Sequence, residues 1–464
     1  RGLVGSEMCI RDRFYYKAII LTDHLTKGNG SRKEKYVMAK KTGVLKEEFK
    51  NGVYRDLLKD IYVDEGVLDY QTERYIKALE SYEKLYGEQE VEIYSAPGRS
   101  EVGGNHTDHQ HGKVLAASIN LDIIAVVAPR EDGVIEVKSE GYPKTVVDLS
   151  SLKPLKRENG TSIALIRGVA ARIKEMGYQI GGFQAYATSD VLSGSGLSSS
   201  AAYEVLIGTI LSGLYNDMKL DAVDIAKIGQ YAENVYFGKP CGLMDQTASS
   251  VGGLIHIDFA DPDNTLVKKF DVDFEAYDHC LCITDTKGSH ADLTDEYAAI
   301  PADMKKAAAY FGKEVLRQVD EKEFYGKLAE IREKLGDRPV LRAIHFFEEE
   351  KRVDAEIAAL ERGDFDAFKK WVKASGASSF QYLQNVFTVR DLNGQGLSVG
   401  LAVSDAVLGE RGVSRVHGGG FAGTIQAFVP GDAVQEYKDA LDGVFGKGSC
   451  HVLKVRKYGG MKVL

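Results

Sequence analysis

Along most of this chain, stretches with apolar residues at strand-like spacing alternate with stretches at helical spacing. Between residues 90 and 279, short apolar or alternating runs, as at residues 90–95 and 119–127, interleave with stretches of helical periodicity. From residue 280 onward helical spacing dominates, with helices expected at 301–311, 321–335, 341–362 and 364–375. A strand is expected at residues 280–284 and a strand pair at 425–429 and 450–455. The mixture predicts an α+β protein of two lobes, for which 464 residues and 44% hydrophobic content are sufficient.

The residues before the first predicted strand carry a helical pattern of their own. Apolar residues at helical spacing are Leu57, Leu58, Ile61, Tyr75, Ile76, Leu79 and Tyr82. We therefore expect a helical extension at residues 38–89 that packs on the first lobe, then an N-terminal domain at 90–279 and a C-terminal domain at 280–464. Residues 1–37 lack clear periodicity, and residues 1–13 read like a translated sequencing adapter. We expect them to be read-through and the native protein to begin at Met38.

A glycine- and serine-rich segment leads into a helix predicted around residues 205–214. It reads Leu192-Ser-Gly-Ser-Gly-Leu-Ser-Ser-Ser-Ala-Ala202. The first N–H groups of a helix lack intrahelical partners and attract anions, and Gly194 and Gly196 let an anion approach the backbone. Such a loop binds phosphate groups, although it is neither a Walker loop nor a dinucleotide fingerprint. Taken alone, it fits a flexible serine-rich turn equally well.

Two further segments collect side chains suited to chemistry. Residues 96–115 place glycines, Arg99, three histidines and Asp108 between two predicted strands, where loops often carry function. Residues 238–253 place one acid, Asp245, among small and apolar residues. Burial and a nearby cation would compete there to set the pKa of Asp245.

With these three segments, the chain resembles a galactokinase of the GHMP kinase superfamily. The family's first signature, Gly-Arg-x-Asn-x-x-Gly-Glu-His-Thr-Asp-Tyr, corresponds to Gly98-Arg-Ser-Glu-Val-Gly-Gly-Asn-His-Thr-Asp-His109, and the serine-rich loop resembles its ATP-binding motif. Pro240-Cys-Gly-Leu-Met-Asp-Gln246 resembles the segment of its catalytic aspartate, and Val416-His-Gly-Gly-Gly-Phe-Ala-Gly-Thr-Ile425 its third glycine-rich motif. The resemblance implies a ribosomal-protein-S5-like N-terminal lobe and a ferredoxin-like α/β-sandwich C-terminal lobe, with ATP and sugar bound between them.

The resemblance also implies a role for each matching residue. Asp245 would accept or orient the proton of the sugar's anomeric hydroxyl, and Arg99 would stabilise charge on the transferring phosphoryl group. Ser200 and Glu233 would bind Mg²⁺, which prefers oxygen ligands. The cofactor ATP would lie with its phosphates against Gly194, Ser195, Gly196, Leu197, Ser198, Ser199 and Ser200. The substrate-binding residues would be Asn105, His106, Asp108, Gly242 and Tyr297.

Three positions depart from the family's first signature. Glu101 stands in place of its asparagine, Asn105 in place of its sugar-contacting glutamate, and His109 in place of its tyrosine. These changes lie near the sugar, so kinase activity is more firmly indicated than the identity of the sugar. We expect an ATP-dependent sugar 1-kinase acting on galactose. The alternatives are a GHMP kinase for an N-acetylhexosamine or a uronic acid, and a catalytically inactive sugar- and ATP-binding regulator.

Each assignment has a simpler structural alternative. Arg99 would cap the end of a strand, and Asp245 would cap a helix. Glu233 would be a solvated acid on a helix predicted at residues 222–237. Gly418-Gly-Gly420 would be a plain turn. His106, His109 and His111 resemble a metal cluster on paper, but no paired cysteines or His-x-x-x-His spacing supports zinc.

Composition and charge narrow the class of protein. The net charge of −9 disfavours a nucleic-acid or membrane partner. No apolar stretch is long enough to span a bilayer or to act as a secretion signal. The five cysteines have no framework spacing, which suits a reducing compartment. We expect a cytoplasmic enzyme, a monomer or weak oligomer, whose partner is a small-molecule sugar.

Overall fold

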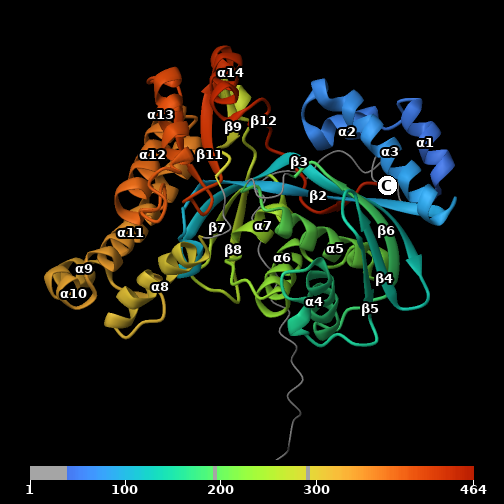
Figure 1. Ribbon diagram of the computed structural model, residues 1–464, viewed down its shortest axis with the longest axis horizontal. Coiled ribbons are helices and arrows are strands. Elements are labelled where there is room, and N and C mark those ends of the chain that lie inside the picture. Colours follow the sequence, from blue (N-terminus) through green and yellow to red (C-terminus); the bar gives the residue numbers. More distant parts are fainter. Residues whose placement is uncertain (1–38, 192–195, 289–292) are drawn as a thin grey trace, which may run out of the picture.

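A computed structural model describes residues 39–191, 196–288 and 293–464 of the chain. These residues form an α+β molecule with a nine-stranded sheet and a separate four-stranded sheet. Figure 1 shows the two lobes that they build, with the blue-to-green elements in one and most of the orange and red elements in the other. The expected α+β, two-lobed architecture is confirmed. The expectation about residues 1–37, and the loop positions Gly194 and Ser195, lie outside the described residues.

The larger sheet is centred on two long antiparallel strands. Along its main path it consists of β1 (Lys40–Lys41), β2 (Glu90–Gly103), β3 (Lys113–Arg130), β6 (Gly182–Ser189), β4 (Val134–Ser139) and β5 (Lys144–Asp148). Off this path, β13 (Met461–Lys462) pairs with β2, whereas β7 (Leu254–Asp258) pairs with β3 and with β8 (Leu266–Phe270).

Strands β2 and β3 extend well beyond the runs predicted at residues 90–95 and 119–127. The apolar alternation in β2 ends at Ser95, but pairing with β3 continues to Gly103 through irregularities at Pro97/Arg99 and Glu101/Gly103. These irregularities hide the strand from a periodicity analysis, because each one shifts the side-chain alternation. The strand thereby carries Arg99 into the middle of the molecule.

Helices cover both faces of this sheet (Figure 1). Ile124 and Val126 of β3 pack in the core under α1 (Thr42–Lys50), α2 (Arg55–Tyr62) and α3 (Leu68–Tyr86). Ile123, Ala125 and Val127 alternate with them and belong to the core on the other face. That face carries α4 (Ser162–Glu175), α5 (Ser199–Asn216), α6 (Ala222–Tyr231) and α7 (Met244–Val251). A strand buried on both faces needs apolar residues at nearly every position, as β3 has.

The helix predicted at residues 222–237 is present, with one refinement. It begins at α6, where the Asp221 side chain accepts a hydrogen bond from the Val223 N–H at 2.7 Å. Its last part, η5 (Ala232–Phe237), is a π-helix that ends at Gly238, whose φ is +83°. A π segment is a frequent companion of functional sites, and this one carries Glu233.

The second lobe contains the four-stranded antiparallel sheet. Its order is β10 (Val413–His417), β11 (Thr424–Pro430), β9 (His279–Asp285) and β12 (Cys450–Leu453). The predicted pairing of the strands at 425–429 and 450–455 is wrong, because both pair with β9, which lies between them. Periodicity locates strands but does not say which strands are neighbours.

The second lobe contains the four predicted helical regions, whose bounds differ mainly at their ends, and two further helices, the last two below, that were not predicted. They are α8 (Thr294–Tyr310), α9 (Glu321–Gly326), α10 (Leu328–Leu335), α11 (Asp337–Glu361), α12 (Phe365–Ser378), α13 (Gly396–Leu408) and α14 (Val434–Phe445). Helix α8 begins before Pro301, which lies inside it. The region predicted as one helix at 321–335 is divided at Lys327. None of the described helices is both long and apolar enough to cross a membrane.

The end of the chain returns to the first lobe. Strand β13 pairs with β2, and Val463 and Leu464 are buried in the core beneath α1–α3. Arg456 is fully buried and forms an ion pair with Asp122 of β3 at 2.8 Å. The N-terminal helices, the central strands and the C-terminal residues thus form one packed unit.

Candidate active site

Arg99 and Asp245 form a forked ion pair at the centre of the predicted site. Arg99 Nε donates to Asp245 Oδ1 at 2.7 Å, and its Nη2 donates to Oδ2 at 2.9 Å. The third nitrogen, Nη1, donates to the carbonyl of Gly196 in the serine-rich loop. The Ser198 hydroxyl also donates to Asp245. Three segments that are distant in the sequence therefore meet at one carboxylate and one guanidinium: the strand that bears Arg99, the serine-rich loop and the segment that bears Asp245.

The position of Asp245 excludes the simple capping role. Helix α7 begins at Met244 with Leu243 as its N-cap, so Asp245 lies inside the first turn. Its side chain keeps 33% exposure while Arg99 beside it keeps only 7%. Burial alone raises the pKa of Asp245, but Arg99 and the Ser198 hydroxyl outweigh it and hold this pKa below its ordinary 3.8. The site thus presents an ionised carboxylate toward solvent at neutral pH.

Arg99 is likewise more than a strand cap. It lies within β2, and its pKa is raised because Asp245, Glu101 and Asp108 outweigh the opposing effect of burial. A guanidinium held by a planar fork keeps its charge and its orientation. Arg99 is therefore a fixed positive charge at the point where the loop and α7 meet.

Ser200, Glu233 and two unpredicted residues form a second cluster. The Ser200 hydroxyl donates to Glu233 Oε1 at 3.2 Å, and Gln246 Nε2 donates to both Glu233 Oε2 and Glu204 Oε2 at 3.0 Å. Glu233 is 3% exposed, so it is not a solvated helix acid. Burial and the neighbouring Glu233 raise the pKa of Glu204 well above 4.5. This cluster gathers oxygen atoms in a buried place next to the loop.

Two of these oxygens have no hydrogen-bond donor among the described residues. They are Glu204 Oε1 and Gln246 Oε1, both buried. Buried acceptors without donors are costly, and a bound cation satisfies them. The described residues contain no group of three or more His, Cys, Asp or Glu side chains placed to hold a metal ion. A cation bound here would accordingly depend on ligand or water oxygens as well as protein oxygens.

Asp108 and Gly242 lie directly against each other. Asp108 opens the short helix η3 (Asp108–Gln110) and accepts a hydrogen bond from the His109 N–H at 2.9 Å. A Cβ atom added to Gly242 would lie 1.7 Å from Asp108 Oδ2. Only glycine lets the 240–246 segment approach this carboxylate so closely. The structure therefore brings together two residues predicted to bind substrate.

His106 and Tyr297 both bind the Gly418–Gly420 segment. His106 Nε2 lies 3.0 Å from the Gly419 carbonyl and must therefore carry the proton, and the Tyr297 hydroxyl donates to the Gly420 carbonyl at 2.7 Å. Burial lowers the pKa of His106 to about 3, so its ring is neutral. The glycine-rich segment is thus a docking point for two predicted sugar-binding residues, not a plain turn.

Asn105 differs from the other predicted substrate residues because its amide is occupied by protein groups. Its Nδ2 donates to Glu101 Oε1 at 2.9 Å and to the Gly418 carbonyl at 2.7 Å. Its Oδ1 accepts from Asn385 Nδ2 at 2.9 Å and from the Ser379 hydroxyl at 3.2 Å. The residue has 0% exposure. Through these hydrogen bonds, Asn105 of the first lobe is bound to Gly418, Ser379 and Asn385 of the second lobe.

Sequence reasoning missed the charge that accompanies Asn105. Arg415, fully buried in β10, binds Glu101 Oε1 at 2.5 Å. Burial raises the pKa of Glu101 to about 7, although Arg415 and Arg99 favour its charged form. Asn105 and Glu101, the two exchanged signature positions, are therefore direct neighbours. The sequence did contain a sign of this contact. The family signature has an asparagine at position 101 and a glutamate at position 105, and this chain has the same two residue types in the opposite order.

Glu204 and Gln246 were also missed, although each leaves a trace in the sequence. Glu204 is an acid in an otherwise apolar helix and lies four residues after Ser200, on the same helix face. Gln246 directly follows Asp245. A charged residue on a buried helix face is unusual enough to mark a functional position.

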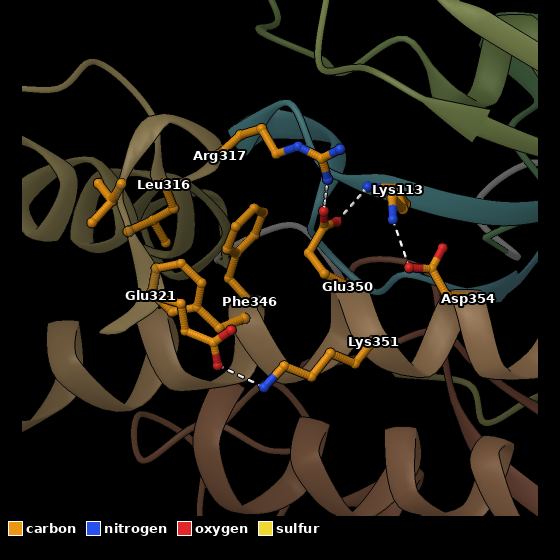
Figure 2. A pocket seen from close by; sticks show the side chains of 10 residues that line it. Lys113, Leu316, Arg317, Glu321, Phe346, Glu350, Lys351 and Asp354 are labelled. Carbon is orange, nitrogen blue, oxygen red and sulfur yellow. Dashed lines mark hydrogen bonds and ion pairs between the residues drawn. The ribbon is translucent and has the colours of Figure 1, made fainter. Parts of the chain in front are cut away.

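A pocket elsewhere on the molecule contains none of the predicted site residues. It has a volume of about 270 Å³ and lies between the start of β3, the 316–321 segment and α11 (Figure 2). Its charged side chains bind one another: Arg317 to Glu350, Lys113 to Asp354 at 2.6 Å, and Lys351 to Glu321 at 2.6 Å. Because these side chains already neutralise one another, the pocket offers a charged ligand little net attraction.

The chain is similar in sequence and in fold to known proteins. Residues 80–129 match the galactokinase galactose-binding signature, and residues 164–253 match the N-terminal domain of GHMP kinases. A galactokinase of Streptomyces coelicolor is 32% identical over 372 residues, covering 79% of this chain and 92% of that protein. The crystal structure of Lactococcus lactis galactokinase complexed with galactose has a TM-score of 0.72 at 25% identity, covering 82% of this chain and 98% of that one. The Methanococcus jannaschii mevalonate kinase, at 15% identity, has a TM-score of 0.55 over 78% of this chain and 98% of its own.

The fold and the match to the N-terminal domain of GHMP kinases define a GHMP kinase. Galactokinases are the members of this class that transfer a phosphoryl group to a hydroxyl group of a sugar. Within it, the chain belongs to the galactokinase family.

Proposed function

We propose that this chain transfers the γ-phosphoryl group of ATP to the anomeric hydroxyl of D-galactose. The observation that carries the proposal is the Arg99–Asp245 fork, which is joined to the serine-rich loop through Gly196 and Ser198. The family signature at residues 80–129 supports galactose as the sugar. The galactose named in the Lactococcus lactis structure supports it as well.

Positioning and charge stabilisation account for most of this reaction. Phosphoryl transfer passes through a loose transition state and asks for little covalent chemistry from the protein. The loop that contains Gly196 to Ser200 would bind the ATP phosphates at the N-terminus of α5. Arg99 would stabilise the charge that builds up between the attacking oxygen and the phosphoryl group. Its fork with Asp245 fixes its direction.

Asp245 would act on the sugar hydroxyl. Its ionised carboxylate accepts or orients the proton of the attacking hydroxyl, whose oxygen then forms the new bond to phosphorus. The Ser198 hydroxyl holds one carboxylate oxygen in place. The remaining sugar hydroxyls would be held by His106, Asp108, Gly242 and Tyr297. The ring of His106 is neutral and its Nε2 donates to the Gly419 carbonyl, so its Nδ1 is free to accept a hydrogen bond. Asn105 would act by fixing the loop that bears His106.

Mg²⁺ fits the Ser200 and Glu233 cluster. A hydroxyl, a carboxylate and the orphaned oxygens of Glu204 and Gln246 are hard ligands of the kind that this ion prefers. When bound, the ion would neutralise phosphate charge. It would also lower the pKa of Glu204, which burial and Glu233 raise, because a nearby cation favours the ionised carboxylate.

The proposed function is tested by ADP release from Mg-ATP with a panel of free sugars. The panel is galactose, N-acetylgalactosamine, glucose and galacturonate, with a sugar-free reaction as the blank. Turnover with galactose alone is the expected result. Turnover only with N-acetylgalactosamine or galacturonate would transfer the assignment to a related sugar kinase. No turnover with any sugar, together with measurable sugar binding, would favour the regulator.

The metal assignment predicts a specific defect in two variants. Ser200→Ala and Glu233→Gln are expected to raise the Mg²⁺ concentration needed for half-maximal turnover by about tenfold or more, since each removes an oxygen ligand. The measurement is an Mg²⁺ titration at fixed ATP. Glu175→Gln, which removes an exposed acid on α4, is the control and should leave the titration unchanged. An unaltered Mg²⁺ dependence in both site variants would remove them from the metal site.

A further inference from the structure

Helix α3 of the N-terminal extension contacts the residue that leads into the phosphate loop. That residue is Asp190, which follows the last residue of β6 and is separated from the loop by Val191 alone. Tyr70 Oη donates to Asp190 Oδ1 at 2.7 Å, and Gln71 Nε2 donates to Oδ2 at 3.1 Å. Arg74 Nη1 lies 2.9 Å from Oδ2. Three side chains from one helix therefore hold one carboxylate.

Arg74 links this contact to the centre of the sheet. Its Nη1 donates to Asp122 Oδ1 at 2.7 Å, and its Nη2 donates to the carbonyls of Asp122 at 2.8 Å and Thr188 at 3.1 Å. The Asp190 N–H donates in turn to the Asp122 carbonyl at 2.9 Å. Asp122 is fully buried, and Arg74 is 6% exposed. Strong, buried, charge-assisted bonds fix this corner of the first lobe.

The two ends of the loop close on the strand that bears Arg99. A Cβ atom added to Gly98 would lie 3.1 Å from Val191 Cγ1 and 3.0 Å from the Leu197 carbonyl. The Arg99 N–H donates to that same carbonyl at 3.2 Å, and Arg99 Nη1 donates to Gly196. Since Val191 directly follows Asp190, a shift of Asp190 is passed to the loop ends and to Arg99.

We infer that Tyr70, Gln71 and Arg74 of α3 are positioning residues for the phosphate loop, acting through Asp190. The inference rests on the proposed ATP-dependent function and gives the N-terminal helices a part in it. These helices do more than cover apolar surface, because a buried apolar face alone does not require three polar bonds to a single carboxylate at the loop. Their contribution falls on ATP binding, whereas the sugar-binding residues lie on other segments.

The test compares ATP and sugar affinities in Asp190→Asn and Tyr70→Phe. Asp190→Asn keeps the shape of the side chain, and Arg74 retains Asp122 as its charged partner, so the variant is expected to fold. Its Kd for ATP, measured by titration calorimetry, should rise by about 3- to 30-fold, with the KM for galactose changed by less than about twofold. Tyr70→Phe removes one hydroxyl from the same carboxylate and should weaken ATP binding in the same direction.

A matched control exists on the same helical extension. The Tyr458 hydroxyl donates to Asp60 of α2, which is also a tyrosine–carboxylate contact between these helices and the rest of the lobe. Tyr458→Phe should leave the Kd for ATP unchanged. An equal rise in this control, or unchanged ATP binding in both test variants, would overturn the inference. Failure of the unaltered protein to bind ATP would overturn the proposed function itself.

Discussion

Asp245→Asn is expected to lower kcat by about a hundred- to ten-thousand-fold, with the Kd for ATP changed by less than about twofold. Asparagine fills the same space and still accepts a hydrogen bond from Arg99, but it can neither take a proton nor supply negative charge. The loss therefore falls on the transition state rather than on ground-state ATP binding. Single-turnover ADP formation and calorimetric ATP titration together measure the two quantities.

The control for this variant is another arginine–aspartate ion pair. Asp258 receives hydrogen bonds from Arg317 Nη2 at 3.0 and 3.2 Å, outside the predicted site. Asp258→Asn removes a comparable charge and should retain most of the turnover. Turnover of Asp245→Asn within about tenfold of the unaltered protein, with Asp258→Asn equally active, would assign the catalytic role to another group.

The pH profile provides a second check on Asp245. Its pKa is held below 3.8, so the carboxylate is already ionised throughout the range in which the protein is assayed. No loss of kcat/KM from its protonation is expected as pH falls from 7 to about 5. An acid limb in this interval that disappears in Asp245→Asn would contradict the pKa direction given by its partners.

Asn105→Glu is expected to destabilise the protein by about 3 kcal/mol or more. The new carboxylate would lie beside Glu101, whose pKa burial already raises to about 7, in a place with no exposure to solvent. Arg415 is bound to Glu101 and cannot neutralise two acids. Glu101→Asn should also be destabilising, because it leaves Arg415 buried without its carboxylate. Urea unfolding followed by circular dichroism measures both effects.

The double variant decides whether the two exchanged positions form one unit. Glu101→Asn with Asn105→Glu restores the order of amide and acid found in the family signature and keeps one carboxylate near Arg415. Its destabilisation should be smaller than the sum of the two single variants by about 2 kcal/mol. Asn105→Gln, which adds length without charge, is the control for size. Strict additivity, or single variants as stable as the parent, would show that Glu101 and Asn105 are independent.

Much of the candidate site was visible as contiguous motifs. The serine-rich loop was recognised because glycine, serine and the start of a helix are adjacent in the sequence. The helix that this segment leads into was predicted from its apolar spacing, and in the structure it begins at Ser199, within the segment. The resemblance assigned Ser198 to the ATP phosphates, and the structure adds that its hydroxyl donates to Asp245. The residue types in the loop showed which functional groups are present. Which group each hydroxyl binds depends on how the chain packs.

Strand pairing was harder to predict than the strands themselves. The alternation of apolar residues located β11 and β12, yet both pair with β9 rather than with each other. The irregularities in β2 concealed the half of that strand that carries Arg99. Periodicity reports which face of an element is buried, and it carries no information about which element lies against that face.

The sequence by itself determined the α+β class, the family and the residues able to perform the chemistry, because short motifs and regular apolar spacing encode them locally. Only the tertiary structure decided which of these residues meet. Arg99 reaches Asp245 across 146 positions, Arg415 reaches Glu101 across 314, and Tyr70 reaches Asp190 across 120. Such contacts follow from how two lobes and a helical extension pack around one sheet. The free energy of that packing is a property of the whole chain and is not written in any single segment.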